Sequence, residues 1–271
     1  MINHIKNLEF NGFSVMKIDD LNSLKLSKKF IKEMDIAKGK DDLSSFYPVN
    51  NSDKLKNILN FNFKKLYLSY KLKKFSKINN FKNISDNYFK EDSILTKIDS
   101  YISYPKDENI INWHTDMASP QTKKNSTEII PIDPKRGLLK FILYLTESVA
   151  DDISFAVIPE SHKVSTAYKE MIFNKKLYYQ SHWSISDFKK IIHNKEIRNK
   201  LNENLETNVL EKFIHNIDFD EKKDTTMFDI PLNFMNVIMF DEHTYHRAKS
   251  PKKSRRFIYR FCYGRKRIYK N

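Results

Sequence analysis

The chain has 271 residues, 40% hydrophobic and 13% aromatic, which is enough for one domain with an enclosed core and excludes a disordered chain. The single cysteine, Cys262, excludes an internal disulfide and a cysteine-based zinc site, so any metal must be held by nitrogen and oxygen ligands. The net charge of +14 comes mainly from lysines spread along the chain, and we interpret it as a solvated surface rather than a nucleic-acid or membrane site.

The N-terminal part is predicted to be mainly helical. Residues 11–18 resemble a short strand, and Asp20 can cap a helix that runs to about Lys38. A second helical region is expected between Asp53 and Phe75, where lysines flank an apolar stripe typical of a helix that covers a sheet. The first ten residues match neither a secretory signal nor a transit peptide, and no apolar run approaches the roughly 20 residues of a transmembrane helix. A cytoplasmic protein is therefore expected.

From Ser93 onward the pattern changes to short β-rich runs separated by turn residues. The predicted strands cover residues 94–104, 110–113, 138–145, 153–158, 227–230, 236–241 and 256–263. Residues 165–216 return to a helical pattern, in 167–177 and 184–215. We predict one α+β domain over residues 1–271, with an N-terminal helical region at about 20–76, a β-core at about 94–163 and 227–263, and a helical, lid-like insertion at about 165–216.

Three side chains in this pattern form a candidate metal site. His114 and Asp116 are two residues apart at the end of a predicted strand, so both project from the same face. His246 follows another predicted strand, which can lie beside the first once the sheet closes. Two imidazoles and one carboxylate on one side of an ion leave the other positions open, as oxygen-activating ferrous enzymes require. We predict that these three residues are the metal ligands and the catalytic centre.

A pair of arginines follows the third candidate ligand. Arg255 and Arg256 open an aromatic strand, and a guanidinium suits a buried carboxylate better than an ammonium group does. If Arg256 faces the cavity, the aromatic residues of the strand pack outward under helices; if Arg255 does, they crowd the interior. These aromatic residues are Phe257, Tyr259, Phe261 and Tyr263. We favour Arg256 and keep Arg255 as the alternative.

Two further residues are candidates for contact with a substrate. Arg260 lies on the same face as Arg256, so it either meets an anionic substrate group or forms an internal salt bridge. Trp113 precedes the first candidate ligand, and we favour a packing role for it over a substrate platform.

Five segments, in this order, resemble the phytanoyl-CoA dioxygenase family, a branch of the Fe(II)- and 2-oxoglutarate-dependent oxygenases. They are residues 114–116, 137–147, 155–163, 240–246 and 254–263. The resemblance covers roughly residues 94–163 and 227–263. It implies a double-stranded β-helix, a cupin-like jelly roll. It also implies Fe(II) on His114, Asp116 and His246 and the distal carboxylate of 2-oxoglutarate on Arg256.

Three positions depart from the pattern of that family. Glu160 stands where the family often has the glycine of Pro-Gly-Ser-His, and Met235-Asn236 stands where it has Gly-Asp. Ala248 stands where a hydroxyl residue usually binds 2-oxoglutarate, so another group must compensate or the cosubstrate binds less tightly. The candidates for this compensation are Lys140, Tyr144 and Ser254.

The resemblance implies a dioxygenase that consumes 2-oxoglutarate and O2, releases succinate and CO2, and oxidises a small polar or anionic metabolite, such as an amino acid, a biosynthetic intermediate or a phosphonate. Hydroxylation is the preferred reaction, because Asp116 occupies the position that related halogenases leave open for chloride, and desaturation and ring formation stay as alternatives. The alternatives are a non-catalytic jelly-roll binding module, or an oxygenase that acts on nucleic acid, protein or acyl-CoA. No membrane or nucleic-acid partner is expected, and the pattern does not predict an oligomeric state.

The remaining histidines are interpreted as structural. Four of them are expected at the surface or in ordinary hydrogen bonds: His4, His182, His193 and His215. His162 is expected to hold a loop. His243 is a rival to His246, but a separation of three residues places it on the opposite face of an extended segment.

Overall fold

The computed structural model describes residues 2–36, 63–106, 109–116, 121–122, 129–130, 135, 137–146, 155–180, 182–219 and 227–269. The ends of two predictions, a helix reaching Lys38 and a strand starting at residue 153, lie outside these residues, as does the predicted helical stretch 53–62. Among the helices that are described, none is both long and apolar enough to cross a bilayer.

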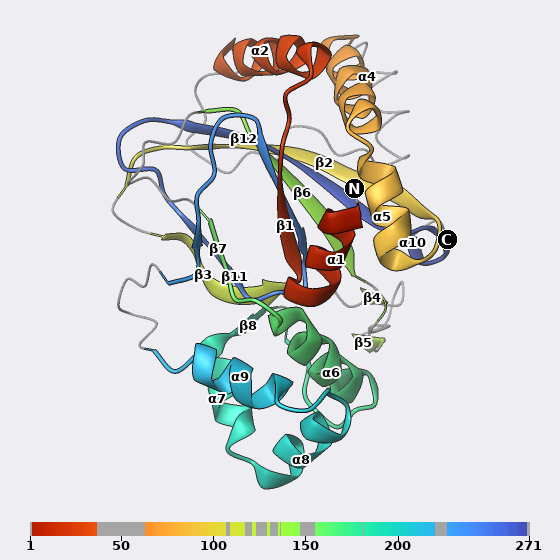
Figure 1. The fold of residues 1–271 in the computed structure, drawn as a ribbon, viewed down its shortest axis with the longest axis vertical. Helices are drawn as coiled ribbons and strands as arrows, with labels where there is room; N and C mark the ends of the chain where they lie inside the picture. The colour runs from red at the N-terminus through yellow and green to blue at the C-terminus, as the bar shows by residue number, and fades with distance from the viewer. Residues whose placement is uncertain are drawn as a thin grey trace.

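Two antiparallel five-stranded sheets form the centre of the molecule (Figure 1). The first has the order β1 (Phe13–Lys17), β10 (Asn236–Asp241), β6 (Leu138–Tyr144), β12 (Arg256–Arg265) and β2 (Ser93–Ser103). The second has the order β8 (His182–Ser184), β3 (Asn109–Asp116), β11 (His246–Lys249), β7 (Phe155–Val157) and β9 (Asp229–Ile230). A separate two-stranded ladder joins β4 (Gln121–Thr122) and β5 (Ile129–Ile130).

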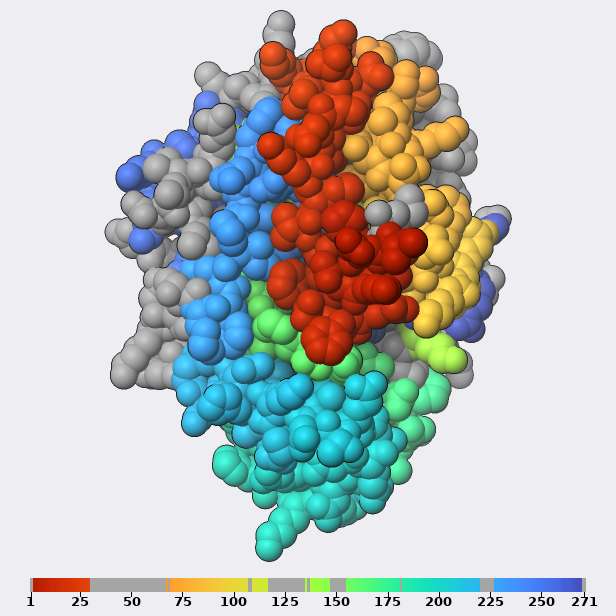
Figure 2. Space-filling model, in the orientation of Figure 1, coloured from red at the N-terminus to blue at the C-terminus, as the bar shows by residue number. Residues whose placement is uncertain are grey.

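Helices cover the outer face of each sheet. The first sheet is flanked by α1 (Ile2–Asn11), α2 (Leu21–Ile36), α4 (Phe63–Ile78), α5 (Phe81–Phe89) and α10 (Lys266–Tyr269). The second is flanked by α6 (Ser161–Phe173), α7 (Ile185–Ile192), α8 (Lys195–Glu203) and α9 (Val209–Asn216). Figure 2 shows α1, β1 and α2 running along one face, with the helices of residues 185–216 packed as a layer at one end.

Strand alternation divides the buried residues among three layers. On the outer face of the first sheet, Phe141 stacks on Phe81 of α5 with ring centroids 4.5 Å apart. Between the sheets, Ile142 and Phe240 of the first sheet pack with Phe155 of the second. The outer face of the second sheet packs against the helices that follow β7. The interior between the sheets is therefore apolar, except where charged side chains enter it.

In two turns, a residue other than glycine has the positive φ angle that favours glycine. Glu160 immediately precedes α6 with φ 61°, and Met235 immediately precedes β10 with φ 64°. These are the two positions at which the sequence departs from the glycines of the family that it resembles. The backbone geometry of both turns is thus the geometry that glycine adopts without strain.

Candidate metal centre

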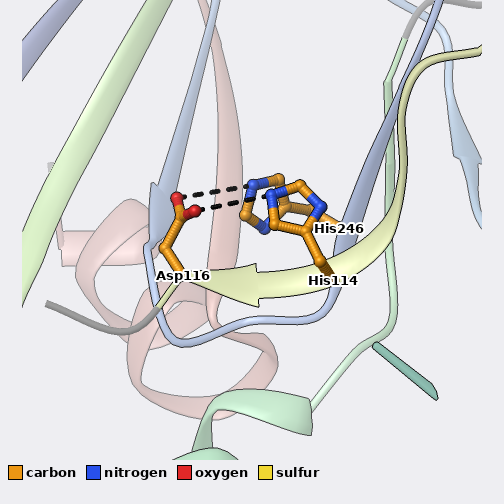
Figure 3. A group of neighbouring side chains, drawn as sticks. All are labelled: His114, Asp116 and His246. Carbon is orange, nitrogen blue, oxygen red and sulfur yellow. Dashed lines mark ion pairs between the residues drawn. The ribbon is translucent and has the colours of Figure 1, made fainter. Parts of the chain in front are cut away.

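Three side chains meet at the end of β3. His114 and Asp116 lie on β3, and His246 begins β11 directly opposite His114 in the antiparallel register. One ligand atom from each residue lies within 4.8 Å of the others. Figure 3 shows the three side chains pointing toward one another. His114 Nε2 is 3.4 Å from Asp116 Oδ1, and His246 Nε2 is 3.8 Å from Asp116 Oδ2. The three predicted ligands are therefore close enough together to share one ion.

Backbone carbonyls orient both imidazoles. Nδ1 of His114 lies 2.7 Å from the carbonyl oxygen of Asn112, and Nδ1 of His246 lies 2.9 Å from that of Thr244. A carbonyl only accepts hydrogen bonds, so these contacts assign the proton to Nδ1. Both Nε2 atoms then carry a lone pair directed at the Asp116 carboxylate, which is the form that binds a metal.

Electrostatics favour the ligating forms. Burial alone would raise the pKa of Asp116, but the charge of Lys140 and a hydrogen bond from His182 hold this pKa well below its usual range. Burial, followed by the neighbouring His114, lowers the pKa of His246 to about 3. At neutral pH the carboxylate is therefore ionised and the His246 ring is neutral.

Lys140 enters the site from β6. Its ammonium group contacts Asp116 Oδ2, and Glu242 Oε2 lies 3.4 Å from the same nitrogen. The second oxygen of Glu242 accepts a 2.8 Å hydrogen bond from the backbone N–H of Leu138. Lys140 thus holds one oxygen of Asp116, while the other faces His114. The sequence predicted Lys140 at the site as a cosubstrate ligand but gave no indication of Glu242.

His182 lies at the surface, as the sequence predicted, but also at the rim of the centre. β8 pairs with β3 so that His182 is opposite Asp116, and its Nδ1 is 3.5 Å from Asp116 Oδ1. The side chain is 65% exposed, and the hydrogen bond to Asp116 is the main cause of its raised pKa. Ser184, opposite His114, ends β8 and caps α7 in a capping box with Asp187. The contact with Asp116 was not predicted, because β8 has only three residues and lies within the helical excursion.

Sequence comparison with protein-family models and with curated proteins gave no match. The fold, in contrast, resembles solved structures. AviO1 from Streptomyces viridochromogenes Tue57 matches with a TM-score of 0.53 and 10% identity, covering 97% of this chain and 94% of AviO1. HygX from Streptomyces hygroscopicus, with nickel and 2-oxoglutarate bound, matches with a TM-score of 0.52 and 11% identity, covering 98% of this chain and 87% of HygX. SnoK, a non-heme alpha ketoglutarate dependent carbocyclase from nogalamycin biosynthesis, matches with a TM-score of 0.53 and 11% identity, covering 98% of this chain and 84% of SnoK.

The chain shares the fold of these proteins. At 10–11% identity the similarity extends to the arrangement of strands and helices over nearly the whole chain.

The two arginines that follow His246 have different surroundings. Arg256 is 5% exposed, and its Nη1 donates a 2.7 Å hydrogen bond to the carbonyl of Lys249. Arg255 is half-buried, with its guanidinium 5.3 Å from the centroid of the Phe257 ring. The aromatic residues of β12 pack in the cluster under α4 and α5, as expected if Arg256 faces inward. Of the other candidates, Tyr144 is buried among the residues between the sheets, whereas Ser254 is exposed.

Trp113 does not line the centre; it has the packing role that the sequence favoured, and its alternative placement as a substrate contact is corrected. Its side chain is 3% exposed and packs with Phe219 and Phe228 on the outer face of the second sheet. Since neighbouring strand residues point to opposite faces, an inward His114 requires an outward Trp113. His243, the rival ligand, is likewise outside the ligand cluster, with its Nδ1 3.2 Å from Asp241 Oδ1.

Proposed function

We propose that this protein is an Fe(II)- and 2-oxoglutarate-dependent dioxygenase that hydroxylates a small polar or anionic metabolite, with release of succinate and CO2. The proposal depends on one observation, the convergence of two oriented imidazoles and one ionised carboxylate at the end of β3. This donor set is that of mononuclear non-haem iron oxygenases. HygX, which has the same fold, has been solved with iron and with nickel and 2-oxoglutarate, and this supports the same ligands here.

The strand order supports a double-stranded β-helix within this fold. Strands β2, β3, β6 and β7 alternate between the two sheets, and so do β9, β10, β11 and β12. The resulting four-stranded halves have the orders β2-β12-β6-β10 and β3-β11-β7-β9. These orders support the double Greek key of a jelly roll. The five sequence segments favour the phytanoyl-CoA dioxygenase branch of the superfamily.

The residues of the chain have distinct roles in this proposal. His114, Asp116 and His246 hold Fe(II), which activates O2 when it is bound together with 2-oxoglutarate. Arg256, buried on the inner face, binds the distal carboxylate of 2-oxoglutarate through a charge-assisted pair. Apolar residues between the sheets, including Phe240, keep water from the reacting groups.

Anaerobic addition of Fe(II) and 2-oxoglutarate tests the metal centre. We expect the weak visible charge-transfer band of an iron–2-oxoglutarate chelate in the wild-type protein and no band in His114→Ala. Near-UV circular dichroism checks that the variant is folded. Folded wild-type protein without the band, or an unchanged band in His114→Ala, would contradict the proposal.

The same band tests the assignment of Arg256. We expect Arg256→Lys to raise the 2-oxoglutarate concentration for half-maximal absorbance about tenfold, because lysine cannot form the two parallel hydrogen bonds of a guanidinium. Arg255→Lys is the matched control and should leave this concentration unchanged. The reverse result would assign the cosubstrate to Arg255.

A further inference from the structure

An ionic cluster that the proposed metal centre does not use lies on the inner face of the first sheet. Its members are Arg260, Asp99, Tyr101 and Lys97, which we call the Arg260 cluster. Nε and Nη2 of Arg260 donate to the two oxygens of Asp99 at 2.9 and 2.6 Å. Lys97 Nζ is 2.7 Å from Asp99 Oδ2, and the Tyr101 hydroxyl is 3.1 Å from the same oxygen. The salt bridge predicted as one alternative for Arg260 is therefore present.

The strand register places the cluster on the same face of the first sheet as Lys140, which reaches Asp116 on the second sheet. Ile258, two residues before Arg260 on β12, packs between the sheets, whereas Tyr259 and Phe261 lie in the outer cluster. Asp99 is opposite Arg260 across the β12–β2 pair. On the other side β12 pairs with β6, where Cys262 is opposite Lys140. One strand spacing, about 4.8 Å, thus separates the strand of the cluster from the strand whose lysine contacts Asp116.

The accessible part of this cluster is cationic. The Asp99 side chain is 0% exposed and is surrounded by its three partners. The side chains of Arg260 and Lys97 remain 24% and 41% exposed. Within the described residues, Nη1 of Arg260 makes no hydrogen bond. One buried carboxylate does not need two cations and a hydroxyl group for neutralisation, so the cluster has positive charge available for a ligand.

We propose that the Arg260 cluster is the subsite that binds an anionic group, a carboxylate or a phosphate, of the substrate. This inference rests on the proposed function, because it orients the substrate toward the metal centre. Asp99 fixes the guanidinium before the ligand arrives, which reduces the conformational entropy lost on binding. Lys97 adds a second cation at the same place. A cationic substrate group would be repelled by both side chains and could not reach the buried Asp99.

Isothermal titration of the full-length protein with inorganic phosphate and with acetate, at saturating 2-oxoglutarate and fixed ionic strength, tests the subsite. The 2-oxoglutarate occupies Arg256, and the two probes distinguish a phosphate site from a carboxylate site. We expect wild-type protein to bind at least one probe, and Arg260→Gln to weaken this binding about tenfold. Lys97→Met should weaken it by a smaller factor.

Arg198→Gln is the matched control. Arg198 also pairs with both oxygens of a carboxylate, Glu211, but on the exposed surface of α8 and α9, so its loss should not change binding. Folded wild-type protein that binds neither probe, or equal binding by wild type and Arg260→Gln, would overturn the subsite.

Two measurements keep the test decisive. If Arg260→Gln does not fold because Asp99 has lost its partner, the double variant Arg260→Met/Asp99→Leu removes both charges. A folded double variant that binds the anion as tightly as the wild type overturns the subsite. The charge-transfer band separates the two proposals. A band without anion binding contradicts the subsite alone, whereas Arg260-dependent anion binding without a band contradicts the iron centre and supports an anion site.

Discussion

At the scale of single residues, Lys140 neutralises two carboxylates that the fold brings together. It is 5% exposed, contacts Asp116 and lies 3.4 Å from Glu242, which is 4% exposed. Burial alone would lower the pKa of Lys140, but the two carboxylates raise it above its usual value, so the ammonium form is the one present. In metal-free protein this lysine supplies positive charge at the place where a divalent ion would also supply it.

Lys140→Met tests this interpretation. We expect the metal-free variant to lose about 3 kcal/mol of stability, because two buried carboxylates then lose the cation that contacts them both. A divalent ion can replace the missing charge, so Ni(II) should raise the melting temperature of the variant more than that of the wild type. Thermal unfolding with and without Ni(II) measures both effects, and Lys200→Met, which removes the partner of the exposed Glu196, is the control. Equal shifts in the variant and the wild type would refute this role for Lys140.

The sequence predicted part of the candidate site because strand geometry is local. The two-residue spacing of His114 and Asp116 determines that they share a face, and alternation along β12 selects Arg256 over Arg255. His182 and Glu242 reach the site through β8 and through the turn after β10, and no periodic pattern marks either residue. Contacts that depend on the pairing of distant strands are not encoded in the spacing of neighbouring residues.

At the scale of elements, the turn before α6 tests the cost of a left-handed backbone. Glu160 has φ 61°, a conformation that costs non-glycine residues roughly 1–2 kcal/mol. Its side chain pairs with Lys163 at 3.3 Å and with Lys212 at 3.9 Å, and these partly exposed ion pairs compensate only weakly. We expect Glu160→Gly to raise the free energy of unfolding by about 0.5–1 kcal/mol, after allowing for the greater freedom of glycine in the unfolded chain.

Met235→Gly is the contrasting control. Met235 has a similar φ of 64°, but its side chain is 1% exposed in the core cluster of the first sheet. The loss of this burial outweighs the relief of strain, so the variant should be destabilised by about 1–3 kcal/mol. Urea unfolding compares both variants with the wild type. A destabilised Glu160→Gly would show that the ion pairs of Glu160 contribute more than its backbone strain costs.

Long elements with a clear period were predicted, and short or weakly patterned ones were not. Strands β2, β6, β10 and β12 lie where alternating or apolar runs predicted them. Helix α1 was missed because its sequence carries no capping or periodic signal that separates it from a loop. Helix α6 begins at Ser161, six residues before the predicted start at 167, because the left-handed Glu160 ends the preceding turn.

At the scale of the whole molecule, the helical excursion forms a layer and also contributes to the site. Trp113 and Ala156 of the second sheet pack in one cluster with Tyr168 of α6 and Phe188 of α7. The only described strand of the excursion, β8, joins the edge of this sheet and carries His182 to Asp116. The sequence predicted that helices interrupt the β-core, but not that a strand within them borders the metal centre, because only the closed fold makes them neighbours. The lid-like role of the excursion stays a prediction.

Buried neutral histidines make the stability of the metal-free protein sensitive to acid. Burial lowers the pKa of both His243 and His246 to about 3, whereas the unfolded value is about 6.5. Their stabilising effect is therefore complete above pH 6.5 and is lost as the pH falls toward 3, by up to about 1.4 kcal/mol per pH unit for each histidine. Asp99 and Asp241, whose pKa values are lowered on folding, add to the loss only near and below about pH 4.

Urea unfolding between pH 7.5 and 4.5 should show this decline in stability. His243→Gln should make the decline shallower, since glutamine does not titrate and its amide can still donate to Asp241. Parallel pH profiles for the two proteins would mean that folding does not lower the pKa of His243.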